Sequence, residues 1–239
     1  MSPRTRTARA VLLALAVGGA PVLQLSNFLT HPEVPATGAG LLELVARDPA
    51  GWFRIHAIAG ASAVLSIVAS VALASLVRQR GAALATLGAA LATVGGGMLA
   101  IAFGAEAHLA SLAADPSLDR TAMSALLDLE PASPATALLM AGFPVAGIGS
   151  LLVAVALLRS RAVPRWLPAL VILGLVASIF SAPGSHVGPL LLAPAVVGYL
   201  GLALEVVRAA RRSPADTDTP APPAEQEDGR QPHPELSRA

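Results

Sequence analysis

Residues 166–204 read WLPALVILGLVASIFSAPGSHVGPLLLAPAVVGYLGLAL and contain no Asp, Glu, Arg or Lys. Uncharged apolar runs of about 18 residues or more are typical of transmembrane helices, because roughly 20 helical residues cross the ~30 Å hydrocarbon layer. This run is almost twice that length, and the proline, glycine and serine residues of SAPGSHVGPL (181–190) interrupt it near its middle. The stretch therefore predicts two membrane-spanning helices joined by a turn.

The composition of the whole chain agrees with a membrane protein. Of its 239 residues, 54% are apolar and 13% are charged, whereas a soluble domain carries about 25% charged residues. The absence of cysteine excludes disulfides, thiolate metal sites and cysteine nucleophiles. Every basic residue is Arg and none is Lys, which, with abundant Ala, Gly and Pro, favours a GC-rich bacterial genome. We expect the lipid bilayer, and no nucleic acid, as a partner, because the arginines flank apolar segments and form no basic patch.

We predict an all-α integral membrane protein, folded as a compact bundle of six transmembrane helices. Helices are favoured over strands because each run is long enough to cross and must satisfy its own backbone hydrogen bonds in lipid. Residues 1–9 are predicted to flank a transmembrane domain at 10–212, followed by a disordered tail at 213–239 that is rich in Pro, Ala and charged residues. The predicted spans are 10–29, 55–77, 82–107, 135–158, 166–182 and 188–207.

The distribution of arginine predicts the orientation of these spans. Most arginines lie at 4–9, 78–80, 159–165 and 208–212, on one side of the predicted bundle, and only Arg47, Arg54 and Arg120 lie on the other. The positive-inside rule then places both termini in the cytoplasm, in the cytoplasmic membrane of a bacterium. An alternative for the first span is a cleaved signal peptide. Pro21 after the small-residue cleavage point, and an apolar run that continues to Leu29, favour a retained helix.

Two outer loops are longer than simple turns, at 30–54 and 108–134. Within them, 41–46 (LLELVA) and 122–127 (AMSALL) have the apolar spacing of short amphipathic helices. We expect both helices to lie on the outer surface of the membrane.

Four histidines fall at the predicted outer face, which suggests a site. His31, His56, His108 and His186 share that face with Glu106. Imidazole and carboxylate groups at a partly dry boundary bind divalent metals, ligate haem iron or carry protons. His56 is the leading candidate because it lies about one turn inside a span, where ionisable groups are costly. The candidate ligands of a haem or divalent metal are therefore His56, His108, Glu106, His186 and His31.

A structural role for the same residues stays open. No H-E-x-x-H motif and no pair of histidines at i, i+4 is present. Glu106 and His108 are two residues apart, so they can share a site only if the helix has ended there. Histidines at headgroup depth also bind water, lipid phosphate or backbone carbonyls. Ser181 and Ser185 lie on the same face, but no G-x-S-x-G motif supports hydrolytic catalysis.

Glycines lie in the middle of two spans, at 95–97 and within 142–149, where Pro144 also occurs. Close helix packing is the favoured interpretation, and a hinge or an unwound ligand site is the alternative.

For the function, the leading hypothesis is a binding, sensing or accessory membrane protein without catalytic machinery. The alternatives are a haem- or metal-binding redox protein that uses the outer histidines, and a small solute transporter. The sequence leaves open a protein partner or a homo-oligomer.

Overall fold

The computed structural model describes residues 3–179 and 188–211, and this part of the chain is all helical apart from its connections. His186, the predicted turn around it and the predicted tail lie outside the described residues. Residues Glu130–Ala132 form a short 3-10 turn. The helices are α1 (Pro3–Thr30), α2 (Gly38–Arg47), α3 (Pro49–Ala74), α4 (Ala82–Ala114), α5 (Arg120–Asp128), α6 (Pro134–Ser160), α7 (Trp166–Ile179) and α8 (Gly188–Arg211).

Five of these helices, α1, α3, α4, α6 and α8, are long and apolar enough to cross a membrane. Helix α7 is also apolar but has 14 described residues, about 21 Å at 1.5 Å per residue, which is less than the hydrocarbon thickness. The helical membrane class is therefore confirmed. The sixth crossing and the orientation of the termini stay predictions.

Large apolar side chains cover the outside of the bundle. The side chains of the long helices that are more than half exposed include Leu12, Leu15, Ile101, Met140 and Leu190. An apolar surface of this extent is unfavourable in water but suits a hydrocarbon environment, where helices are apolar on every side.

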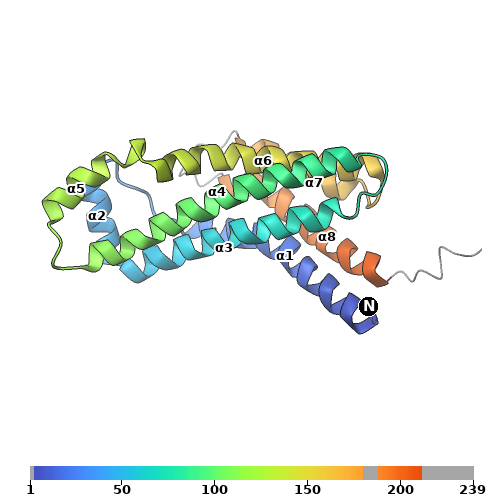
Figure 1. Cartoon of the computed structure of the whole chain (residues 1–239), viewed down its shortest axis with the longest axis horizontal. Coiled ribbons are helices and arrows are strands. Elements are labelled where there is room, and N and C mark those ends of the chain that lie inside the picture. The colour runs from blue at the N-terminus through green and yellow to red at the C-terminus, as the bar shows by residue number, and fades with distance from the viewer. Residues whose placement is uncertain (1–2, 180–187, 212–239) are drawn as a thin grey trace, which may run out of the picture.

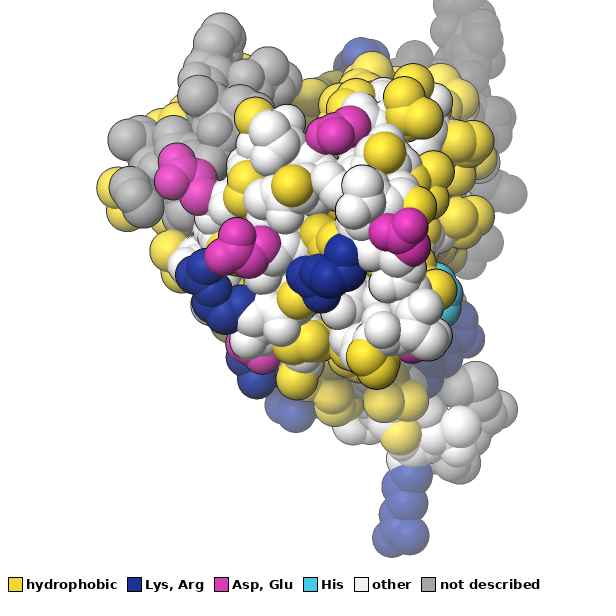
Figure 2. Space-filling view, turned by 90° about the vertical axis from the view of Figure 1, so that its left-hand side faces the viewer, with side chains coloured by type: hydrophobic (Ala, Val, Ile, Leu, Met, Phe, Trp, Pro, Cys, Tyr) yellow, Lys and Arg dark blue, Asp and Glu magenta, His cyan; other side chains and the backbone are white. Residues whose placement is uncertain are grey.

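The six longest apolar helices pack as a closed ring in the order α6, α4, α3, α1, α8, α7, with α7 returning to α6. Successive long helices run in alternating directions along the bundle, so neighbours in this ring are antiparallel (Figure 1). The N-terminus, the α3–α4 connection, the α6–α7 connection and the end of α8 all lie at the right-hand end in Figure 1. We call this the arginine end because it carries Arg4, Arg6, Arg78, Arg80, Arg159, Arg161, Arg165, Arg208 and Arg211. Helices α2 and α5 lie at the opposite end, where acidic side chains are spread among a few arginines (Figure 2).

The two short helices occupy the segments 41–46 and 122–127. The apolar side of α2 (Leu41, Leu42 and Val45) is buried against Trp52 of α3 and the last turns of α4. The N–H of Gly38 donates to Asp128 Oδ1 at 2.6 Å, which ties the start of α2 to the end of α5. Helix α2 therefore caps the ends of α3 and α4, and the membrane depth of both short helices stays a prediction.

Two helices are longer than the predicted spans at this end. Helix α3 begins at Pro49 rather than Ile55, because Asp48 Oδ1 accepts the Gly51 N–H at 2.8 Å and caps the helix. Helix α4 continues to Ala114 rather than residue 107, because its extra turns bury Leu109, Ala110 and Ala113 against α2. Asp115 follows the last residue of α4, and its Oδ1 accepts hydrogen bonds from the hydroxyl and the N–H of Ser117. These hydrogen bonds lower the pKa of the Asp115 carboxyl.

Candidate ligand site between helices α1 and α3

Helices α1 and α3 face each other with polar side chains inside the bundle. Gln24 and Asn27 lie on α1, and His31 directly follows its last residue, Thr30. The His31 N–H donates to the Asn27 carbonyl at 2.9 Å and continues the helical turn, so these residues, spaced three and four apart, lie on one face. We use the name polar seam for the group formed by these three residues and by Trp52, His56 and Ser62 of α3. Asn27, His56 and Ser62 are all buried.

Ser62 sets the register of the seam. Its side chain is fully buried, and its hydroxyl lies 2.9 Å from the Ala20 carbonyl oxygen and 3.2 Å from Gln24 Oε1. A buried hydroxyl that bonds to a neighbouring helix fixes the two helices relative to each other. Because the helices are antiparallel, residues that precede Ser62 on α3 lie beside residues that follow Gln24 on α1.

Three rings form the end of the seam nearest α2. The ring centroids of Trp52 and His56 are 4.4 Å apart, those of His31 and His56 are 5.4 Å apart, and those of His31 and Trp52 are 6.0 Å apart. Trp52 Nε1–H also donates to the main-chain carbonyl of Glu106 at 2.8 Å. The cluster therefore connects α1, α3 and α4.

Backbone hydrogen bonds determine the tautomer of both histidines. His31 Nδ1 lies 2.9 Å from the Pro32 carbonyl, and His56 Nδ1 lies 2.9 Å from the Trp52 carbonyl. A carbonyl oxygen only accepts, so each Nδ1 carries the proton and each neutral ring keeps a lone pair on Nε2. Histidines that bind metals are held in the same way: one ring nitrogen binds the metal, and the other donates its N–H to a carbonyl or carboxylate.

Asn27 adds a third acceptor. It is 7% exposed, and its Oδ1 has no hydrogen-bond partner among the described residues. Its place on α1, one turn from both Gln24 and His31, puts it between the Ser62 contact and the histidine pair. The seam therefore offers acceptors, which suit a cation or a ligand that donates hydrogen bonds.

A pocket of about 480 Å³ opens beside the seam, between α1, α2 and α3. Ser26 and Thr30 line it from α1, and Ile55 and Ile58 line it from α3; its charged lining residues are Arg47, Asp48 and Arg54. Trp52 belongs to both the pocket and the seam. The pocket thus brings the end of the seam close to the surface of the molecule.

The structure brings together two of the five predicted ligands, His31 and His56. Glu106 and His108 lie on α4, which continues beyond them, so their side chains project about 200° apart. His108 is exposed. Residues 3–179 and 188–211 contain no group of three or more His, Cys, Asp or Glu side chains that could hold a metal ion. Because His186 lies outside these residues, the five-ligand site stays a prediction.

Sequence reasoning did not identify Gln24, Asn27, Trp52 and Ser62 as members of a site. The spacing of polar residues at 24, 27 and 31 was the available signal, since a polar stripe in an apolar span faces protein or ligand. The predicted second span begins at residue 55, so Trp52 falls in the predicted outer loop at 30–54.

These features define a helical membrane protein with a buried polar cluster between two of its helices. A family model described as Domain of unknown function (DUF4386) matches residues 9–204, and the chain belongs to this family. The match extends from α1 into α8 and so includes the polar seam. No curated protein and no solved structure matches the sequence.

Proposed function

We propose that this is a membrane-embedded binding protein that holds a small cationic or hydrogen-bond-donating ligand in the polar seam. Asn27 Oδ1, a buried acceptor without a partner among the described residues, carries the proposal. Leaving such an acceptor unsatisfied costs about 1–3 kcal/mol, which a donating ligand would recover. The Nε2 lone pairs of His31 and His56 add acceptors of the same kind at the adjacent turn.

A divalent metal is the second candidate ligand, and the distance between the histidines favours it. With metal–nitrogen bonds of about 2 Å and tetrahedral angles, two imidazole centroids on one metal lie roughly 5 Å apart. The His31 and His56 centroids are 5.4 Å apart. The remaining ligands would come from the Asn27 amide oxygen and water, and such a site would give the protein metal-binding or redox chemistry.

Fluorescence of Trp52 tests both candidates. The chain has two tryptophans, so Trp166→Phe leaves Trp52, which contacts His56, as the sole tryptophan, and its emission can be excited selectively. We expect Zn²⁺, Cu²⁺ or methylammonium to change its fluorescence saturably in lipid nanodiscs. His56→Leu should weaken this binding about ten-fold or more, because it removes a group that contacts the ligand. His108→Leu, on an exposed position of α4, is the control and should leave the affinity unchanged.

Asn27→Leu separates a ligand site from a structural polar contact. Without ligand, the variant should be more stable than the parent by roughly 1–2 kcal/mol, because an unpartnered acceptor is removed. With ligand, it should bind more weakly. A less stable Asn27→Leu variant, together with no saturable response to any of the three probes, would show that the seam is structural.

We further propose that α7 belongs to a sixth crossing and that both termini are cytoplasmic, in a bacterial cytoplasmic membrane. The gathering of arginine-rich connections and both described chain ends at one end of the bundle supports this orientation (Figure 1). Green fluorescent protein fused after Arg211 should fluoresce, and alkaline phosphatase at the same position should be inactive. The reverse pair of results would place the C-terminus outside.

A further inference from the structure

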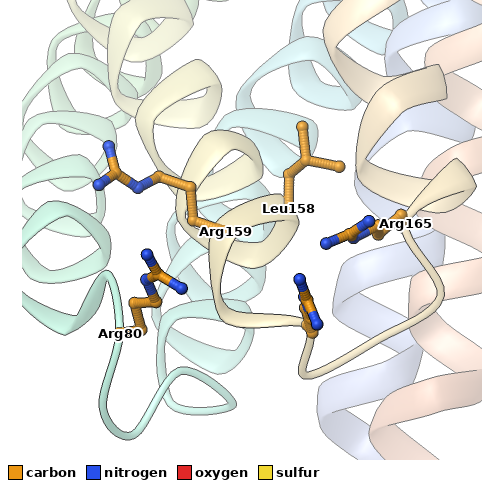
Figure 3. Close-up of a pocket in the computed structure, with 5 residues that line it drawn as sticks. Arg80, Leu158, Arg159 and Arg165 are labelled. Atoms are coloured by element: carbon orange, nitrogen blue, oxygen red, sulfur yellow. The ribbon is translucent and has the colours of Figure 1, made fainter.

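We propose that the arginine end contains a binding site for a phosphate-bearing anion, in the membrane the headgroup of an anionic phospholipid. The site does not depend on the function proposed for the polar seam. It is a pocket of about 510 Å³, lined by Leu158 and by Arg80, Arg159, Arg161 and Arg165. In Figure 3, Arg80 and Arg159 lie near each other on one side of the end of α6, and the guanidinium of Arg165 is directed toward Leu158 from the other side.

Packed backbone holds the arginines in this arrangement. In the α3–α4 connection, Gly81 has φ +94°, and a side chain there would lie 3.3 Å from the Ala156 carbonyl oxygen, so this connection rests directly on the end of α6. Val77 precedes Arg80 and is buried in the main core. Val163 lies between Arg161 and Arg165 and is buried in the same core. The two connections therefore cannot move apart without exposing core residues.

The four arginines form no ion pair within the described part of the chain. The ion pairs formed by residues 3–179 and 188–211 join Arg47 to Glu43 and Arg208 to the buried Glu205. The positive-inside rule accounts for arginines on one side of a membrane protein. It does not account for four of them around one concave surface, where like charges repel and an anion would relieve the repulsion.

Arginine selects for phosphate. Its planar guanidinium binds two phosphate oxygens at once, and no lysine is present in the chain to bind as a simple point charge. Trp166 follows Arg165 directly and is 58% exposed, and exposed tryptophan is typical of the membrane–water interface. Leu158 gives the pocket an apolar side. Basic pockets between helices at this depth bind anionic lipid headgroups, so these observations favour a lipid over a soluble anion.

The test measures how the full chain selects lipids in phosphatidylcholine bilayers. Spin-labelled phosphatidylglycerol and spin-labelled phosphatidylcholine are compared by their association constants for the protein. We expect a preference for phosphatidylglycerol of about five-fold or more, because each arginine near the surface contributes about that factor. The double variant Arg80→Gln with Arg165→Gln should lose the preference. The double variant Arg78→Gln with Arg211→Gln is the matched control, since both arginines are exposed at the same end of the bundle and neither lines the pocket.

The outcomes separate a specific site from general surface charge. An equal loss in this control and in the double variant of the pocket would overturn the proposal, as would a wild-type protein that shows no lipid preference and no response to inorganic phosphate. Inorganic phosphate at millimolar concentration is added as a competitor of the spin-labelled phosphatidylglycerol. Displacement of the lipid by phosphate, lost in the double variant of the pocket, would support recognition of phosphate by this site, with a soluble anion as its ligand. If the first double variant does not insert, Arg159→Gln with Arg161→Gln provides the same comparison.

Discussion

Gly149→Ala is expected to lower the free energy of unfolding by about 1–3 kcal/mol, because the added methyl group overpacks a helix contact. Gly147→Ala, two residues away on the same helix, is expected to be neutral or to stabilise by up to ~1 kcal/mol through helix propensity. A methyl group at 149 would overlap the backbone nitrogen of Ala92 on α4, whereas one at 147 would meet nothing within 4 Å. The same substitution should therefore have opposite effects on stability.

The difference arises from the close approach of α4 and α6. Their contacting residues have the same spacing of four, three and four, and glycines on both helices bring the backbones together. A side chain at Gly95 would overlap the backbone of Ala146, and one at Gly88 would lie 2.8 Å from the Gly149 carbonyl oxygen. The residues are Gly88, Ala92, Gly95 and Leu99 on α4, and Gly142, Ala146, Gly149 and Val153 on α6.

Unfolding by sodium dodecyl sulfate in mixed micelles, followed by circular dichroism, measures these changes. Gly97→Ala is a second control on α4, because a side chain there also meets nothing within 4 Å. Equal effects at 147 and 149 would contradict the α4–α6 contact described here.

Trp52→Ala is expected to lower the free energy of unfolding by about 3–5 kcal/mol, the usual cost of truncating a buried tryptophan. Trp52 is 4% exposed, packs with Leu41, Leu42 and Val45 of α2, and bonds to the Glu106 carbonyl on α4. Trp166→Ala is the matched control. Because Trp166 is 58% exposed, its truncation should change stability by less than about 0.5 kcal/mol.

Trp52→Phe isolates the contribution of the hydrogen bond. It keeps most of the buried ring but leaves the Glu106 carbonyl without the Trp52 donor, so we expect a loss of about 1–2 kcal/mol. The same micelle assay measures all three variants. A Trp52→Ala loss no larger than that of Trp166→Ala would show that α2 does not pack on the ends of α3 and α4.

The long apolar helices could be predicted from sequence because lipid imposes strong constraints: a crossing helix needs about 20 apolar residues and must satisfy its backbone internally. The same constraint does not apply to helix ends that extend beyond the predicted spans, so these ends were predicted less well. Helix α4 extends to Ala114 because Leu109, Ala110 and Ala113 find partners on α2, a contact between segments distant in the chain.

The candidate site was predictable only in part. His56 and His31 were predicted as members, and the structure brings their rings together. Whether Glu106 and His108 could share a site depended on where α4 ends, and its continuation directs the two side chains apart. Asn27 could not be identified as a site residue from the sequence, because a single amide in an apolar span is informative only when its neighbours and its missing partner are known.

The sequence by itself predicted a helical membrane protein, and five of its six predicted spans are helices long and apolar enough to cross. Only the tertiary structure decided which face of each helix meets protein. In water, the hydrophobic period of a helix identifies its buried face, but in lipid the packed and the lipid-facing sides are both apolar, so the period disappears. Gly147 and Gly149 are therefore equivalent in the sequence, although one adjoins open space and the other lies against the backbone of α4.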